Sequence, residues 1–90
     1  MLELDKHNRI IISKSYGDLG GKVLHLYYEK NEEWFYLTEE ENSDDFFVSD
    51  RKVDLKNRVT IPLVVREAYK TQKMFVVQKG SRYYLMPVKH

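Results

Sequence analysis

Short runs of β-branched and aromatic residues, several of them alternating with polar residues, recur along this chain, and they predict strands separated by turns. The runs cover residues 9–13, 23–28, 34–38, 46–48 with an extension to 53, 58–61, 74–79 and 82–88. The pattern changes after Pro62, because proline is favoured at the first position of a helix. We therefore predict a mainly β fold with one short helix, Leu63–Tyr69, after Pro62.

The segments between these runs are rich in turn-forming and charged residues. Residues 16–21 contain three glycines and are not expected to be helical, and residues 29–33 form a polar hairpin loop of ordinary length. Asn57 ends a predicted turn in which asparagine is able to take a positive φ angle. Residues 39–45 are acidic and polar, and we interpret them as a solvated linker.

One segment of the chain resembles another. Residues 4–13 align without gaps on residues 53–62, and Asp, Asn, Arg and Ile occupy matching positions in both. We predict a single compact domain, residues 1–90, made of two β-rich repeats at about 1–38 and 46–90 that acidic residues 39–45 join. Two copies would suit a pseudo-twofold barrel in which each half covers the other. Chance similarity between two β-turn-β segments is the alternative.

The composition excludes several classes of protein. A hydrophobic fraction of 42% is too high for a disordered chain, and the absence of cysteine excludes disulfides and thiol chemistry. No secretory signal or membrane-spanning run is visible, so a cytoplasmic protein without a membrane association is expected. The three histidines lack metal-ligand spacing, and residues 17–22 do not match a phosphate-binding loop. We expect no enzyme activity, catalytic residue, metal, cofactor or small-molecule substrate.

The formal net charge of +1 is a cancellation between two halves. Residues 1–45 hold five basic and eleven acidic residues, a net charge of −6, whereas residues 46–90 hold ten basic and three acidic residues, a net charge of +7. Basic residues at this density neutralise phosphates, and arginine also reads guanine edges. A solvated basic face that balances the acidic half is the alternative. The residues concerned are Arg51, Lys52, Lys56, Arg58, Arg66, Lys70 and Lys73.

Residues 53–67 carry a more specific pattern, in which Asp54, Arg58, Ile61-Pro62 and Arg66 follow one another in order. This order resembles the signature of the AbrB/SpoVT/MraZ swapped-hairpin transcription regulators. The resemblance covers residues 51–88 well and 4–37 more weakly, and it implies a swapped-hairpin barrel that binds double-stranded DNA.

The resemblance also implies which side chains meet DNA. Arg51, Arg58 and Arg66 match the family's DNA-contacting arginines, and Lys52, Lys56 and Lys70 would add background attraction. In the first copy Arg9 is the matching arginine, with Lys6 and His7 beside it. The chain departs from the pattern in four places: Glu67 stands for a second helix arginine, Asn57 for the turn glycine and Ser13 for the proline, and residues 17–21 replace the first helix.

Three further questions stay open at the level of sequence. A protein-interaction module that keeps the fold without strong DNA binding, or an antitoxin-like partner protein, is the alternative function. The internal pseudo-dimer would make a monomer sufficient, and exchange of halves would make a homodimer. We interpret Asp5 and Asp54 as turn-forming carboxylates, and we assign the aromatic residues of 27–36 and 83–84 to the core or the sheet surface rather than to base stacking.

Overall fold

A computed structural model describes residues 2–3, 6–41 and 44–88 of the chain. The elements in chain order are β1 Leu2–Glu3, β2 Arg9–Ile11, the single 3₁₀ turn η1 Lys14–Tyr16, β3 Val23–Glu29, β4 Trp34–Thr38, β5 Phe46–Lys52, β6 Arg58–Thr60, α1 Leu63–Tyr69, β7 Lys73–Lys79 and β8 Arg82–Pro87. The mainly β prediction is confirmed, and the helix has the predicted bounds. Strand β1 and the turn η1 were not predicted.

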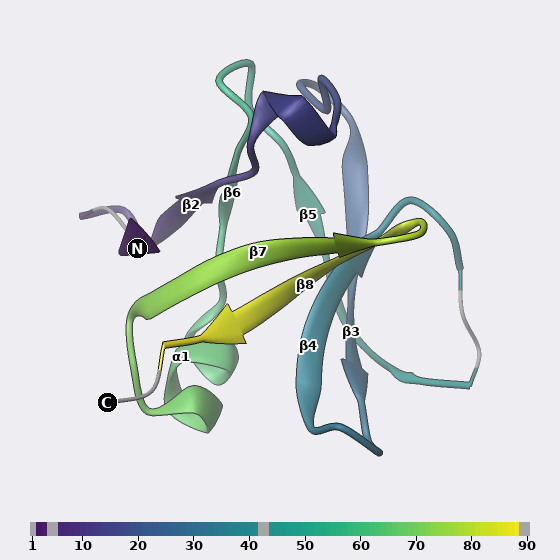
Figure 1. Cartoon of the computed structure of the whole chain (residues 1–90), viewed down its shortest axis with the longest axis vertical. Helices are drawn as coiled ribbons and strands as arrows, with labels where there is room; N and C mark the ends of the chain where they lie inside the picture. Colours follow the sequence, from purple (N-terminus) through teal and green to yellow (C-terminus); the bar gives the residue numbers. More distant parts are fainter. Residues whose placement is uncertain (1, 4–5, 42–43, 89–90) are drawn as a thin grey trace.

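The strands form two antiparallel sheets (Figure 1). The larger sheet has six strands in the order β1-β7-β8-β4-β3-β5, and β2 and β6 pair with each other in a two-stranded ribbon. Neither sheet closes into a barrel among the described strands, so the closed barrel that we predicted is wrong for this part of the chain. The physical reason is that β2 and β6 satisfy each other's backbone groups instead of joining the edges β1 and β5.

Two strand pairings join residues of the first part of the chain directly to residues of the second part. Ile10 pairs directly with Val59, its counterpart in the aligned segments, and Tyr36 pairs directly with Tyr84. Two backbone hydrogen bonds flank the first pair in a reciprocal way: Ile12 N–H donates to the Asn57 carbonyl at 2.9 Å, and Ile61 N–H donates to the Asn8 carbonyl at 2.8 Å. Asn8 and Asn57 both have positive φ angles, of 60° and 62°.

The main core lies between the ribbon and one face of the larger sheet. Residues of alternate parity along a strand point to opposite faces, so each strand sends one set of side chains inward. The ribbon contributes Ile10 and Val59, the residues directly after its strands contribute Ile12 and Ile61, and all four are at most 1% exposed. The larger sheet contributes leucines of β3, β4 and β8. Burial of each such side chain stabilises the fold by roughly 1.5–3 kcal/mol.

The other face of the larger sheet carries a second, aromatic cluster. Tyr27, Tyr36 and Tyr84 are buried there and pack with Trp34 and Met86. Consecutive aromatic residues such as Phe35 and Tyr36 therefore serve different clusters, as alternation along a strand requires.

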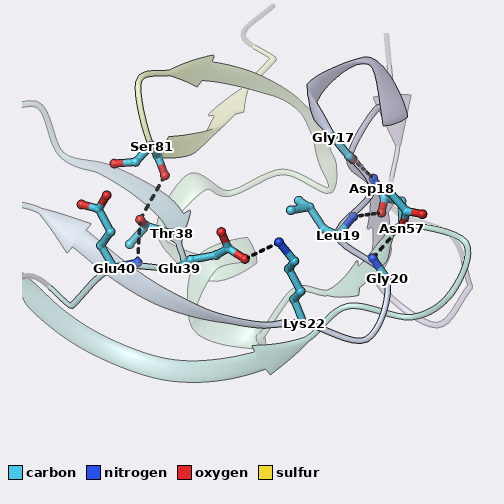
Figure 2. A network of polar contacts seen from close by, with 10 residues as sticks. All are labelled: Gly17, Asp18, Leu19, Gly20, Lys22, Thr38, Glu39, Glu40, Asn57 and Ser81. Atoms are coloured by element: carbon cyan, nitrogen blue, oxygen red, sulfur yellow. Dashed lines mark hydrogen bonds and ion pairs between the residues drawn. The ribbon is translucent and has the colours of Figure 1, made fainter.

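The acidic segment 39–45 contacts the rest of the fold at both of its ends. Glu39 forms an ion pair with Lys22 at 2.9 Å, and this hydrogen-bonded contact raises the pKa of Lys22 (Figure 2). The Asp45 side chain is only 15% exposed, accepts a hydrogen bond from the Tyr36 hydroxyl and lies 3.8 Å from Arg82. The described ends of the segment therefore contact the rest of the fold, and Asp45 does so at the aromatic cluster.

Candidate nucleic-acid interface

The outer face of the β2–β6 ribbon brings together two of the predicted arginines. Arg9 pairs with Thr60 and Ile11 with Arg58, so these four side chains share the face that is opposite to the core. Ile11 is 51% exposed, which shows that solvent reaches this face. Arg9 and Arg58 lie diagonally across the ribbon, and the two positions correspond in the aligned segments.

Asp54 connects both arginines to the turn that precedes β6. Its carboxylate accepts a hydrogen bond from Arg58 Nε at 2.8 Å and lies 3.9 Å from Arg9 Nη1. It also accepts hydrogen bonds from the backbone N–H groups of Lys56 and Arg58, both at 2.9 Å. Partial desolvation raises the pKa of Asp54, but these N–H groups and the Arg58 guanidinium outweigh it and hold the pKa below its usual value.

Asn57 closes this turn and has a role that the sequence did not reveal. Its side chain is completely buried, and its positive φ confirms the predicted backbone conformation. The amide oxygen accepts a hydrogen bond from Leu19 N–H at 2.7 Å, and the amide nitrogen donates to the Gly17 carbonyl at 3.0 Å (Figure 2). The amide nitrogen also donates to the Ile12 carbonyl at 2.8 Å. These side-chain hydrogen bonds of Asn57 therefore hold the irregular segment after β2 against the turn that precedes Arg58.

The glycines of the same segment allow its close approach to the turn. Gly21 N–H donates to the Val53 carbonyl at 2.8 Å, and Val53 N–H donates to the Lys22 carbonyl at 2.9 Å. A Cβ atom on Gly20 would lie 3.2 Å from the Asp54 carbonyl oxygen and 3.2 Å from Leu55 Cα, so a larger residue would push the turn away. The close approach of Gly20 to the turn indicates a packing role for this glycine.

Arg51 and Lys52 do not share one surface. Arg51 pairs with the buried Leu24 on the core side of the sheet, where its Nε donates to Ser49 Oγ at 3.2 Å. Lys52 pairs with Val23 on the opposite face. Lys56 is exposed in the turn itself, close in sequence to Asp54 and Arg58. The ribbon face therefore gathers Arg9 and Arg58 from the predicted set, and Lys56 lies in the turn that precedes β6.

Arg66 and Lys70 belong to the helix, which lies at the other end of β6 from the turn that holds Asp54 (Figure 1). Arg66 is half-buried and its Nε has no hydrogen-bond partner within the described part of the protein. Lys70 is exposed and ends α1 in the left-handed conformation, with φ of 57°. The structure therefore does not bring these two residues to the turn of Arg58, and Asp5 lies outside the described residues.

Comparisons with protein-family models, curated proteins and solved structures found no match for this chain. Within residues 2–3, 6–41 and 44–88, no group of three or more histidine or acidic side chains is placed to hold a metal ion. No helix in the same residues is long and apolar enough to cross a membrane.

Proposed function

We propose that this protein is a small DNA-binding transcription regulator of the swapped-hairpin type, and that the outer face of the β2–β6 ribbon contacts duplex DNA. The observation that carries the proposal is the convergence of Arg9 and Arg58, whose side chains are 26% and 24% exposed, on one face of the ribbon, with Asp54 between them. A two-stranded antiparallel ribbon has the width to enter the major groove, where arginine reads guanine and neutralises nearby phosphates.

The contacts of Asp54 support this role physically. A long side chain that is already held by a carboxylate loses less conformational entropy when it meets a ligand. The carboxylate also removes part of the positive charge, so attraction to phosphate must come from the neighbouring Lys56 and from the basic second half of the chain. We infer moderate, strongly salt-dependent affinity.

The register of the strands supports the proposed pair of repeats. The direct pairs Ile10 with Val59 and Tyr36 with Tyr84, together with the reciprocal bonds of Ile12 and Ile61, are those that an internal twofold relation would produce. We therefore propose an internal pseudo-dimer that is sufficient as a monomer, with sedimentation as the test. A homodimer formed by exchange of halves would have twice the mass.

The proposal is tested by fluorescence anisotropy on labelled genomic DNA fragments over a series of salt concentrations. We expect Arg58→Ala and Arg9→Ala each to weaken binding by about tenfold and to reduce the salt slope by about one unit. Lys30→Ala is the matched control, because it removes one positive charge from the β3–β4 loop, where Lys30 lies over the Phe46 ring at 4.9 Å.

Circular dichroism establishes that each variant is folded. Absence of binding at low salt would refute DNA binding altogether. Equal losses for the two arginine variants and for Lys30→Ala would refute the ribbon as the contact surface, while leaving a general electrostatic attraction.

A protein-interaction module is the second candidate, and one observation favours it. Phe46 and Phe47 are 54% and 58% exposed on β5, one of the two edge strands of the larger sheet. Exposed apolar side chains beside an unpaired strand edge are typical of protein-binding surfaces. If Phe47→Ser abolishes capture of a protein partner while Arg58→Ala leaves it intact, the interaction function is established separately from DNA binding.

A further inference from the structure

The outer face of the β2–β6 ribbon carries an apolar side chain next to one of its arginines. Ile11 is 51% exposed on this face and pairs directly with Arg58. Its neighbours in sequence, Ile10 and Ile12, are at most 1% exposed and belong to the main core. Since alternate residues of a strand point to opposite faces, Ile11 points away from that core. About half of an isoleucine side chain is therefore available for contact with a partner.

The hydrogen-bond pattern of the ribbon places Ile11 close to Arg58. Ile12 N–H donates to the Asn57 carbonyl at 2.9 Å, so this pair is a hydrogen-bonded one. Hydrogen-bonded and non-hydrogen-bonded pairs alternate along an antiparallel ribbon, and the adjoining pair of Ile11 with Arg58 is therefore non-hydrogen-bonded. The Cα atoms of such a pair are only about 4.5 Å apart, and the two side chains leave the ribbon close together.

This spacing fits the bases of a DNA duplex. Successive bases of one strand are about 3.4 Å apart along the helix axis. Two side chains that start about 4.5 Å apart therefore reach the same base pair or neighbouring ones when the ribbon lies in the major groove. In that groove guanine presents the two acceptors that arginine reads, and thymine presents its 5-methyl group to apolar side chains.

We propose that Ile11 is a specificity-determining residue, which contacts the 5-methyl group of a thymine beside a guanine read by Arg58. This inference rests on the proposed function, because it requires the ribbon face to meet the major groove. The branched Cβ of isoleucine restricts its side-chain conformation, so little entropy is lost when Ile11 packs against the methyl group. The protein then prefers DNA in which thymine lies next to guanine.

Deoxyuridine tests this contact directly, because it differs from thymidine only in lacking the 5-methyl group. The probe is the labelled duplex that the wild type enriches most from a random-sequence library, synthesised once with thymidine and once with deoxyuridine at every thymine position. Fluorescence anisotropy measures both affinities. We expect the wild type to bind the deoxyuridine duplex about fourfold more weakly for each contacted thymine, which corresponds to the burial of one methyl group.

Three variants assign the methyl preference to one side chain. Ile11→Ser should bind the thymidine and deoxyuridine duplexes with equal affinity. Leu63→Ser is the matched control, because Leu63 is 54% exposed on α1, outside the ribbon face, and this variant should keep the wild-type ratio of affinities. Ile11→Gln should also lose the preference, and it keeps the inference falsifiable if circular dichroism shows that Ile11→Ser is unfolded.

The outcomes separate this inference from the proposed function. Absence of wild-type binding to any duplex at low salt refutes DNA binding itself, and the role of Ile11 with it. Three other results overturn the role of Ile11 while leaving DNA binding intact. They are binding without enrichment of any sequence, equal wild-type affinities for the thymidine and deoxyuridine duplexes, and a methyl preference that a folded Ile11 variant retains.

Discussion

The two ribbon strands lead into very different structures. After β6, Pro62 introduces the seven-residue helix α1, whereas after β2 the chain makes only the single turn η1. Ser13 stands where the second half has Pro62, and its hydroxyl accepts a hydrogen bond from Ser15 N–H at 3.2 Å. Gly17, at φ of 128°, then ends the turn. A capping serine followed by glycine favours a short turn, and a proline followed by Leu63 favours a longer helix.

As a consequence, backbone groups in the first half of the chain take hydrogen-bond partners from the second half. A short irregular segment leaves backbone groups that no helix satisfies, and buried groups of this kind are costly. Asn57 of the second half supplies partners to Leu19, Ile12 and Gly17 of the first. The first half therefore depends on the second for its local structure, and substitutions of corresponding residues in the two halves should differ in effect.

The largest expected difference is between the two asparagines with positive φ angles. Asn57→Gly keeps the backbone conformation accessible but removes three side-chain hydrogen bonds around buried groups, so the free energy of unfolding should fall by about 3 kcal/mol. Asn8→Gly, at the corresponding position, should change it by less than about 0.5 kcal/mol, because glycine tolerates that conformation. Urea denaturation of the two variants measures both values.

Equal losses of stability in the two glycine variants would show that the side-chain hydrogen bonds of Asn57 do not stabilise the segment after β2. Asn57→Ala adds a backbone penalty to the same loss, since alanine disfavours a positive φ, and it should therefore be the least stable of the three.

Local patterns were sufficient to predict most of the elements. Pro62 before Leu63 fixed the helix start, and β-branched and aromatic runs located β3, β4 and β8 within a residue or two. The positive φ of Asn57 followed from the turn chemistry of asparagine. Alternation also contained the signal that Arg51 and Lys52 face opposite sides of β5, although we placed both in one DNA-binding set.

The remaining features depend on contacts between distant parts of the chain. β1 pairs with β7 through only Leu2 and Glu3, too short a run to leave a pattern. The buried amide of Asn57 contacts a residue 38 positions away, which no local propensity encodes. The separation of Arg66 from the turn of Arg58 likewise follows from the direction in which β6 enters α1, a tertiary feature.

The second difference between the halves concerns their tyrosines. Tyr69 bonds to two backbone groups of β4 and β8, whereas the Tyr16 hydroxyl donates one longer bond, of 3.3 Å, to the Val76 carbonyl. Tyr69→Phe leaves Phe35 N–H and the Leu85 carbonyl without this partner and should lower the free energy of unfolding by about 2 kcal/mol, against about 0.5 kcal/mol for Tyr16→Phe. Thermal unfolding of both variants checks the order, and a larger loss for Tyr16→Phe would contradict it.

A last expected effect is a dependence of stability on alkaline pH, to which Tyr69 contributes. Burial raises the pKa of Tyr69 to about 12, against about 10 in an unfolded chain. Between these values the unfolded chain releases the proton and the folded protein keeps it, so stability falls as pH rises through this window. After allowance for partial solvent exposure, the loss is about 2 kcal/mol at most.

The pKa of Tyr84 is also raised by burial, so the wild-type curve of stability against pH is not diagnostic by itself. The informative quantity is the stability gap between the wild type and Tyr69→Phe, which should be constant below about pH 10 and narrow above it. A gap that stays constant would show that the Tyr69 phenol ionises as readily in the folded protein as in the unfolded chain.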